Sequence, residues 1–395
     1  MQAVILAAGA GKRLWPFSED VPKPMLQIAN KPIMEYIIEA LVENNIRDII
    51  IVVGYKKERI LSYFKDGKQW NATIKYVVQN QQLGTAHALY QAKNQIKNEF
   101  IVLSGDNIIL SSAISAIKEI DKNAILLTES DEPSQYGVAY VSGKILKTIV
   151  EKPVIPDYNI ISTSVIKFTP EIFEDIEKCL AVSKYNLGDL ISECAGKREI
   201  HAITLSNVWK DVIYPWSIIE TNALVCRLIR ECVAGEIDNM AVIRGKVTIG
   251  KDTIIHPGTY ITGPAVIGSG CEIGPSVVIS PYTSIGNNVR ISPFTIIENS
   301  VIMDNAAIGP HSTIQSSVLG EGTTIESELR AISGNATIEV DEQIHRVPHI
   351  GAIVGARCNI QHGVFLNPGT IIGNDCKIYA NTMVSGKIPS KTVVM

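Results

Sequence analysis

The sequence of 395 residues lacks several features that mark specialised classes of protein. Its longest uncharged apolar runs, such as Ile49–Val53, are far shorter than the roughly 20 residues that a membrane-spanning helix needs. Lys and Arg number 36 against 40 Asp and Glu, with no basic block, which argues against a nucleic-acid-binding protein. The seven cysteines include no C-x-x-C pair, which argues against zinc ribbons and disulfides and for a reduced compartment. Because the N-terminus enters an apolar strand without the pattern of a signal peptide, we expect a cytoplasmic protein.

What the chain does have is the composition of a folded protein of two or three domains, with 46% hydrophobic and 19% charged residues. Charged residues become sparser after about residue 240, where the hydrophobic pattern also changes. We therefore predict one domain over residues 1–234 and a second over residues 235–395.

The first domain reads as an α/β unit with a mixed, mostly parallel sheet. Apolar, β-branched runs predict strands at residues 2–6, 49–53, 74–79 and 100–103, and apolar residues spaced by three and four predict helices at residues 32–44 and 84–97. Residues 136–150 read as a hairpin and residues 158–168 as a further strand. In such sheets ligands bind at the carboxyl ends of the parallel strands.

The second domain carries a repeat of six residues. Isoleucine occupies every sixth position from Ile243 to Ile297, Met303 continues the series, and the pattern resumes from Val354 to Val384. This period is the hexapeptide signature of a parallel β-helix with the isoleucines inside. Cys271, Cys358 and Cys376 lie two residues before repeat positions and are expected to fill the core. Residues 308–350 break the register, which predicts an inserted loop or irregular coil.

The first predicted strand leads into a glycine-rich loop, Gly9-Ala10-Gly11-Lys12-Arg13. Such a loop lets backbone N–H groups approach a phosphate chain, and Arg13 adds a fork of donors. Leu14 replaces the third glycine of the dinucleotide-binding fingerprint, and the ending of the P-loop is also absent. Taken alone, the loop is a weak signal.

Further motifs follow the loop in order: Pro22-Lys23-Pro24, Gln79 ahead of Leu83-Gly84-Thr85, Gly105-Asp106 and Glu151-Lys152-Pro153. Together they resemble the sugar-1-phosphate nucleotidylyltransferases over about the first 230 residues. With the hexapeptide domain, the chain resembles the bifunctional UDP-N-acetylglucosamine pyrophosphorylases and glucosamine-1-phosphate acetyltransferases. The resemblance implies a Rossmann-like first domain, a left-handed β-helix and a homo-oligomer, a trimer through the β-helix or a multiple of it.

The implied reaction joins a sugar-1-phosphate to the α-phosphorus of UTP or dTTP and expels pyrophosphate. Because both reactants are anions, cations and a metal ion should carry the catalysis. By resemblance, Arg13 holds the pyrophosphate, Lys23 bridges the α-phosphate and the sugar phosphate, and Asp106 and Asp211 bind Mg²⁺. The nucleotide is held by the residues of the glycine loop and of the pyrimidine pocket: Leu6, Ala7, Ala8, Gly9, Gly11, Gln79, Gly84 and Thr85. His87 reads as a packing residue.

The sugar pocket is implied at Gly137, Glu151, Lys152 and Thr163, with Lys152 also meeting the sugar phosphate. The sequence departs from the family here, because Ser162-Thr163-Ser164 stands where Asn-Ala-Gly or Asn-Thr-Gly is usual. N-acetylglucosamine-1-phosphate and glucose-1-phosphate therefore both remain open as substrates.

A second activity, N-acetylation of an amino-sugar phosphate with acetyl-CoA, is implied by His311, which occupies the place of the family's general base. The tyrosine that the family has three residues later is Ile314 here. A different class of function stays open as the alternative: a regulatory or scaffold subunit of the pyrophosphorylase type that does not catalyse. The presence of Arg13, Lys23, Asp106 and Asp211 favours the enzyme.

Overall fold

The computed structural model describes residues 1–395 and divides them into two units. The first unit comprises residues 1–10, 21–25 and 33–211. The second comprises residues 212–395 together with two short segments from the N-terminal part of the chain, residues 11–20 and 26–32. No helix is long and apolar enough to cross a membrane.

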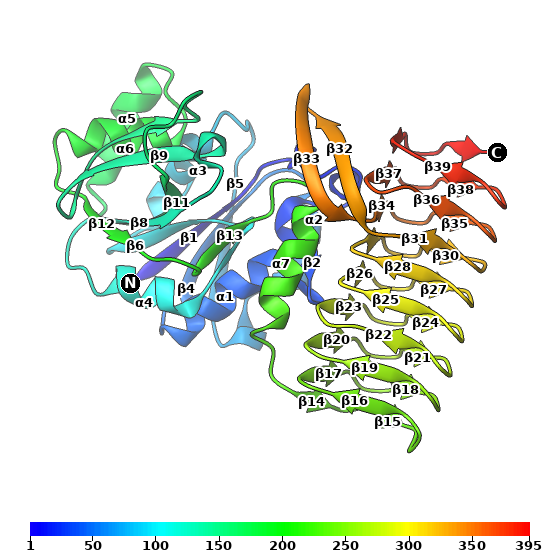
Figure 1. Ribbon diagram of the computed structural model, residues 1–395. Helices are drawn as coiled ribbons and strands as arrows, with labels where there is room; N and C mark the ends of the chain where they lie inside the picture. The colour runs from blue at the N-terminus through cyan, green and yellow to red at the C-terminus, as the bar shows by residue number, and fades with distance from the viewer. The chain divides into compact units, whose positions relative to one another are not determined.

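The first unit is built on a nine-stranded sheet in the order β5-β4-β1-β6-β11-β8-β12-β10-β9 (Figure 1). The neighbours β5, β4, β1 and β6 are parallel, whereas β11 runs antiparallel to both β6 and β8. This confirms the predicted α/β fold with a mixed sheet. The strands are β1 (Gln2–Ala7), β4 (Asp48–Val53), β5 (Thr73–Val78), β6 (Phe100–Ser104), β8 (Ala124–Glu129), β9 (Gly137–Ser142), β10 (Ile145–Glu151), β11 (Ile160–Phe168) and β12 (His201–Thr204).

Helices cover both faces of this sheet, which explains why β1 is apolar without alternation. One face of the sheet packs on α1 (Ile33–Glu43), α2 (Lys57–Phe64) and α4 (Ser111–Lys118). The other packs on α3 (Thr85–Gln91), α5 (Ile172–Ala181) and α6 (Leu187–Ala195). The predicted helices at residues 32–44 and 84–97 correspond to α1 and to α3, and β9 and β10 form the predicted hairpin.

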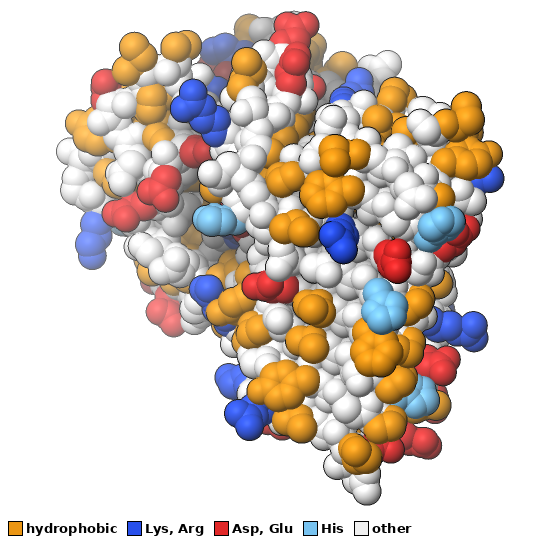
Figure 2. Space-filling model, turned by 45° about the vertical axis from the view of Figure 1, so that its right-hand side comes forward, with side chains coloured by type: hydrophobic (Ala, Val, Ile, Leu, Met, Phe, Trp, Pro, Cys, Tyr) orange, Lys and Arg blue, Asp and Glu red, His pale blue; other side chains and the backbone are white.

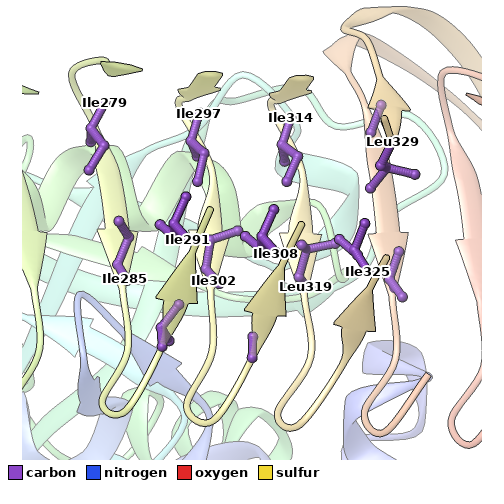
Figure 3. Packing of buried hydrophobic residues seen from close by; sticks show 14 of the residues in the cluster. Ile279, Ile285, Ile291, Ile297, Ile302, Ile308, Ile314, Leu319, Ile325 and Leu329 are labelled. Atoms are coloured by element: carbon purple, nitrogen blue, oxygen red, sulfur yellow. The ribbon is translucent and has the colours of Figure 1, made fainter. Parts of the chain in front are cut away.

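The second unit is a β-helix of the left-handed hexapeptide type, in which three parallel sheets form the sides of a coil. Val247 pairs with Ala265 on the next turn, 18 residues later, so a turn takes three hexapeptides. The isoleucines stack inside, turn upon turn (Figure 3).

The strands of the β-helix fall into three sets. The first sheet contains β14 (Cys232–Val233), β17 (Val247–Ile249), β20 (Ala265–Ile267), β23 (Thr283–Ile285), β26 (Val301–Ile302), β29 (Val318–Leu319), β34 (Ala352–Val354), β37 (Thr370–Ile372) and β40 (Lys387–Ile388). The second contains β15 (Glu236–Ile237), β18 (Ile254–Ile255), β21 (Glu272–Ile273), β24 (Arg290–Ile291), β27 (Ala307–Ile308), β30 (Thr324–Ile325), β35 (Asn359–Ile360), β38 (Lys377–Ile378) and β41 (Val393–Val394). The third contains β16 (Val242–Arg244), β19 (Tyr260–Thr262), β22 (Val278–Ile279), β25 (Ile296–Glu298), β28 (Thr313–Gln315), β31 (Arg330–Ala331), β36 (Phe365–Leu366) and β39 (Met383–Val384).

The hexapeptide reading is wrong in one stretch, where the coil shortens by one residue. Ser284 pairs with Val301, 17 residues later, so Ile302 rather than Met303 enters the core beside Ile285. The coil then continues regularly through Ile308 and Leu319. The insertion is confined to an antiparallel hairpin of β32 (Gly334–Val340) and β33 (Gln343–Ile350). A missing residue shifts the phase of the repeat without interrupting the pairing of the coils.

The short N-terminal segments of the second unit are held by buried amides. Asn222, on α7 (Ser217–Cys226), accepts a hydrogen bond from the backbone N–H of Ala29 at 2.9 Å and donates to the carbonyl of Tyr282 at 2.8 Å. Asn374, on the coil, donates to the carbonyl of Pro16 at 3.2 Å and contacts the carboxylates of the same segment. Residues 11–20 and 26–32 thus belong to the β-helix although they precede it by two hundred residues.

All seven cysteines are free, and every one except Cys232 is buried. Cys271, Cys358 and Cys376 lie in the core of the coil, as predicted. Burial raises the pKa of Cys358 to about 12, which leaves the thiol protonated and unreactive.

Candidate active site

Small residues gather where the central strands of the first unit end. The chain after β4 passes so close to the loop after β1 that a Cβ on Gly54 would lie 2.9 Å from Cβ of Ala8. On the other side, a Cβ on Gly105 would lie 3.1 Å from Cβ of Ala7, and the N–H of Gly105 donates to the carbonyl of Leu6 at 2.8 Å. Gly9 has open space around its Cα. The carboxyl edge of the sheet therefore offers exposed backbone of the kind that receives a phosphate chain.

Lys23 lies between two carboxylates of this unit. Its Nζ is 2.7 Å from Oδ2 of Asp106 and 2.8 Å from Oδ1 of Asp211. Asp106 follows β6, whereas Asp211 ends β13 (Trp209–Asp211), about a hundred residues further along the chain. The three predicted catalytic and metal-binding residues of this unit thus meet in one cluster.

The pairing of two short strands brings the second aspartate to the cluster. β13 runs antiparallel to β7 (Asn107–Ile109), with Asp211 opposite Asn107. In the amide orientation that satisfies both of its ends, Asn107 donates to Oδ1 of Asp211 at 3.0 Å and accepts from Nε1 of Trp209 at 3.0 Å. Asn107 is buried and was not among the predicted site residues. It fixes the carboxylate that Lys23 contacts.

The charges of the cluster reinforce one another. Burial by itself would lower the pKa of Lys23, but the carboxylates of Asp106 and Asp211 outweigh it and raise the pKa above its ordinary value. Burial would likewise raise the pKa of Asp106, yet the neighbouring ammonium group and hydrogen bonds lower it. Lys23 is therefore a cation, and Asp106 an anion, at neutral pH.

The donor chemistry of the cluster fits Mg²⁺. This ion prefers one or two carboxylates completed by water and by phosphate oxygens, rather than a cage of protein ligands. No group of three or more His, Cys, Asp and Glu side chains is present that could form such a cage. Two carboxylates neutralised by a single ammonium group retain a net negative charge, which favours a divalent cation.

The predicted base pocket lies at the end of β5. Gln79 is buried, with 4% of its surface exposed, and its Nε2 lies 3.1 Å from the carbonyl oxygen of Gly84 and 3.0 Å from Nδ1 of His87. His87, which the sequence presents as a packing residue, thus belongs to a hydrogen-bonded group. Thr85 has a structural partner, because its Oγ1 accepts from the N–H of Leu187 at 2.8 Å.

Gly84 is required for a reason that the sequence does not show. A Cβ at this position would lie 2.4 Å from the carbonyl oxygen of Tyr185. That carbonyl accepts hydrogen bonds from the N–H groups of Ala86 and His87 at the start of α3. The glycine therefore makes room for a segment of the protein itself.

The predicted sugar residues lie around the end of β10. The side chain of Glu151 passes between two glycines, because a Cβ would lie 3.0 Å from its Oε1 at Gly137 and 2.1 Å at Gly188. Burial raises the pKa of Glu151. Lys152 adopts a left-handed backbone conformation, with φ of 45°, directly after this residue. Gly188 is a further candidate that the sequence motifs do not reveal.

Thr163 is completely buried, and its hydroxyl donates to the carbonyl of Leu126 at 2.8 Å. Its side chain is engaged within the sheet, so a contact with sugar at this position has to come from the backbone. This agrees with the departure of residues 162–164 from the family motif.

Two predicted residues fall in the second unit. Arg13 follows Gly11, which adopts a left-handed conformation with φ of 61°, and its Nε lies 3.2 Å from Oδ2 of Asp341 on the inserted hairpin. His311 is exposed on a left-handed turn of the coil, with φ of 58°, and its ring stacks on Phe294 at a centroid distance of 5.2 Å. The hairpin's contact with Arg13 could not be read from the sequence.

Comparison with known families agrees with this geometry. The model described as Nucleotidyl transferase matches residues 2–227. The chain belongs to this family. A second model, described as GMPPB C-terminal domain, matches residues 261–346 within the β-helix. The enzyme therefore catalyses nucleotidyl transfer.

Among its relatives, the chain is 34% identical to the bifunctional protein GlmU of Methanococcus maripaludis, over the whole of this chain and 97% of the relative. It is 31% identical to a bifunctional sugar-1-phosphate nucleotidylyltransferase/acetyltransferase of Sulfurisphaera tokodaii, over 98% of this chain and 97% of the relative. The first 54% of the family-sized match is shared with the UTP–glucose-1-phosphate uridylyltransferase AglF of Haloferax volcanii, at 37% identity and 92% coverage of that protein.

A similar fold occurs in a crystal structure described as a glucose-1-phosphate thymidylyltransferase from Bacillus anthracis. The TM-score is 0.53 and the identity 24%, with 57% of this chain and 94% of the other covered. At this identity the likeness shows the fold alone.

Proposed function

We propose that the enzyme transfers a uridylyl or thymidylyl group from UTP or dTTP to a sugar-1-phosphate and releases pyrophosphate. The observation that carries the proposal is the Lys23–Asp106–Asp211 cluster in the unit whose central strands end in exposed glycine backbone. The named activities of the relatives from Sulfurisphaera tokodaii and Haloferax volcanii, both with sugar phosphates, support it.

In this reaction an oxygen of the sugar phosphate attacks the α-phosphorus, and the bond from that phosphorus to the oxygen bridging the β-phosphate breaks. Lys23 supplies a fixed positive charge to the two anions, and the glycine loop supplies backbone donors. Arg13 supplies donors for the leaving pyrophosphate. Asp106 and Asp211 would hold Mg²⁺, which neutralises phosphate charge when it is bound.

The choice of sugar rests on Gly137, Gly188 and Glu151. Glu151 offers acceptors for sugar hydroxyls, and Lys152 offers a cation for the sugar phosphate. N-acetylglucosamine-1-phosphate and glucose-1-phosphate are both substrates to be tested, since the family's asparagine is replaced at Ser162.

The test is pyrophosphate release from UTP, dTTP, ATP and GTP, each with several hexose-1-phosphates, in the presence of Mg²⁺. We expect release with a pyrimidine nucleotide and one or both of the named sugars. Absence of release from every pair would instead support the alternative of a regulatory or scaffold subunit.

A second activity, N-acetylation of an amino-sugar phosphate with acetyl-CoA as co-substrate, is supported by the full-length match to bifunctional relatives and by the exposed ring of His311. His311 would take the proton from the sugar amine. We expect His311→Ala to abolish release of CoA from acetyl-CoA and glucosamine-1-phosphate and to leave pyrophosphate release unchanged. If the unaltered protein releases no CoA, this second activity is absent.

We also propose that the β-helix assembles the chain as a trimer or a multiple of it. Outward-facing residues at one register of the third sheet are apolar and exposed, namely Val242, Tyr260, Ile296 and Met383. Figure 2 shows hydrophobic side chains gathered along this part of the molecule. Large exposed apolar patches mark association surfaces. Light scattering on the eluted protein gives the mass of the assembly, and a monomer would contradict the proposal. Location in the cytoplasm stays a prediction.

A further inference from the structure

The hydrogen bonds around Gln79 give this residue a defined orientation. The carbonyl oxygen of Gly84 can only accept, so the Gln79 group that lies 3.1 Å away must be the amide nitrogen. The second hydrogen on this nitrogen points to Nδ1 of His87, 3.0 Å away. Nδ1 accepts when the imidazole carries its proton on Nε2. Both donors of the amide are thereby used within the protein.

The consequence concerns the other end of the amide. Because both hydrogens of Gln79 are committed, only Oε1 remains to meet a ligand, and it can only accept a hydrogen bond. A free glutamine would present either end by rotating about its last bond. Here rotation would set Oε1 against the carbonyl oxygen of Gly84 and the lone pair of Nδ1, so both neighbours oppose it.

Pyrimidines differ at the atom that such an acceptor reads. Uracil and thymine carry a hydrogen on N3 and donate there, whereas N3 of cytosine has a lone pair and accepts. An oriented Oε1 therefore accepts from uracil or thymine and repels cytosine. Sites that hydrogen-bond one partner discriminate strongly against an analogue that leaves their polar groups unpaired.

We infer that His87, together with the carbonyl of Gly84, fixes the amide of Gln79 as an acceptor and thereby selects pyrimidines that carry a hydrogen on N3 against cytosine. This inference rests on the proposed function and specifies its nucleotide. His87 is a positioning residue, since it acts through Gln79. The same arrangement does not separate UTP from dTTP, because both donate at N3.

The experiment compares kcat/KM for UTP and CTP with the same sugar-1-phosphate. The ratio is measured on one sample of protein, so a partly unfolded fraction affects both values equally. In His87→Leu the imidazole acceptor is lost and rotation of the amide becomes easier. We expect the UTP-over-CTP ratio to fall roughly tenfold, since one hydrogen bond and one lone-pair repulsion change sign.

Two further variants isolate the cause. In His87→Asn, Oδ1 offers an acceptor at a position similar to that of Nδ1, and we expect it to retain most of the discrimination. Gln79→Leu removes the reading oxygen and is expected to lower the ratio at least as far as His87→Leu. The matched control is Gln81→Leu, which makes a similar change at an exposed position of the same loop and should leave the ratio unchanged.

The inference and the proposed function fail in different ways. If no nucleoside triphosphate releases pyrophosphate, the proposed function is wrong. If UTP is used but His87→Leu and Gln79→Leu both keep the discrimination of the unaltered protein, the base is read elsewhere. An equal fall in His87→Leu and His87→Asn would show that the acceptor at residue 87 is not what orients the amide, and would also overturn the inference.

Discussion

The Lys23 cluster makes a prediction about both stability and catalysis. Replacing Lys23 by Met keeps most of the side-chain volume but removes the only positive charge between Asp106 and Asp211. At an effective dielectric constant of about 20, two ion pairs with the observed separations of 2.7 and 2.8 Å attract by about 12 kcal/mol in total. Desolvation of the three groups offsets most of this.

The net cost follows from what is left behind. Removing one partner of a buried ion pair costs about 3–5 kcal/mol, because the remaining charge is buried without compensation. The side chains of Asp106 and Asp211 are 32% and 18% exposed, so water relieves part of the repulsion. We expect Lys23→Met to lower the free energy of unfolding of the first unit by about 3 kcal/mol.

The same variant tests the binding of a divalent cation. Without the ammonium group, the two carboxylates attract Mg²⁺ more strongly, so added Mg²⁺ should recover part of the lost stability even without nucleotide. Thermal unfolding with and without Mg²⁺ measures this. Pyrophosphate release should fall at least about a hundredfold, because a fixed charge that stabilises the transition state is gone.

The control is Lys75→Met in the same unit, whose ion pair with Asp48 is longer, at 3.6 Å, and exposed on both sides. It should cost less than about 1 kcal/mol and leave turnover intact. The reasoning is refuted if Lys23→Met is as stable and as active as Lys75→Met, or if Mg²⁺ stabilises the two variants equally.

Three further predictions concern other parts of the chain. Because the pKa of Asp106 is lowered on folding, its contribution to stability is full above the ordinary value of 3.8 and is lost as the pH falls through the lower folded value; Asp106→Asn should therefore remove part of the acid-induced loss of stability, as measured by unfolding between pH 2 and 6, roughly the range that spans both values, and an unchanged acid limb would contradict this. Gly188→Ala places a Cβ 2.1 Å from Oε1 of Glu151 and should raise KM for the sugar-1-phosphate roughly tenfold by displacing the carboxylate, whereas Gly196→Ala, at the other end of α6, has its nearest neighbour at 3.8 Å and should change nothing; equal KM values in the two variants would exclude the proposed role. Asn374→Ala removes the donor to the segment of residues 11–20 and should speed backbone hydrogen exchange there, seen by mass spectrometry of its peptides, and unchanged protection would show that the segment does not depend on this amide.

The sequence was sufficient for features that repeat or that lie close together along the chain. The period of six determines a β-helix because every turn of the coil buries the same position, and the apolar runs of β1, β4 and β6 determine a sheet covered on both faces. Lys23 and Asp106 could be recognised as site residues because each belongs to a short motif at a strand end.

The tertiary structure decided what depends on pairings between distant segments. Asp211 reaches Lys23 through the pairing of β13 with β7, and His87 orients Gln79 through a contact that no local pattern distinguishes from packing. The shift from Met303 to Ile302 in the core follows from a coil that is one residue short, which pairing with the previous turn reveals.

The placement of residues 11–20 shows the same limit most clearly. These residues read as part of the first domain, yet their hydrogen bonds run to Asn374 and to other residues of the coil. A repeat or a motif records local geometry and burial, which the amino acids state directly. A hydrogen bond across more than three hundred residues depends on how the whole chain packs, so only the folded structure could assign it.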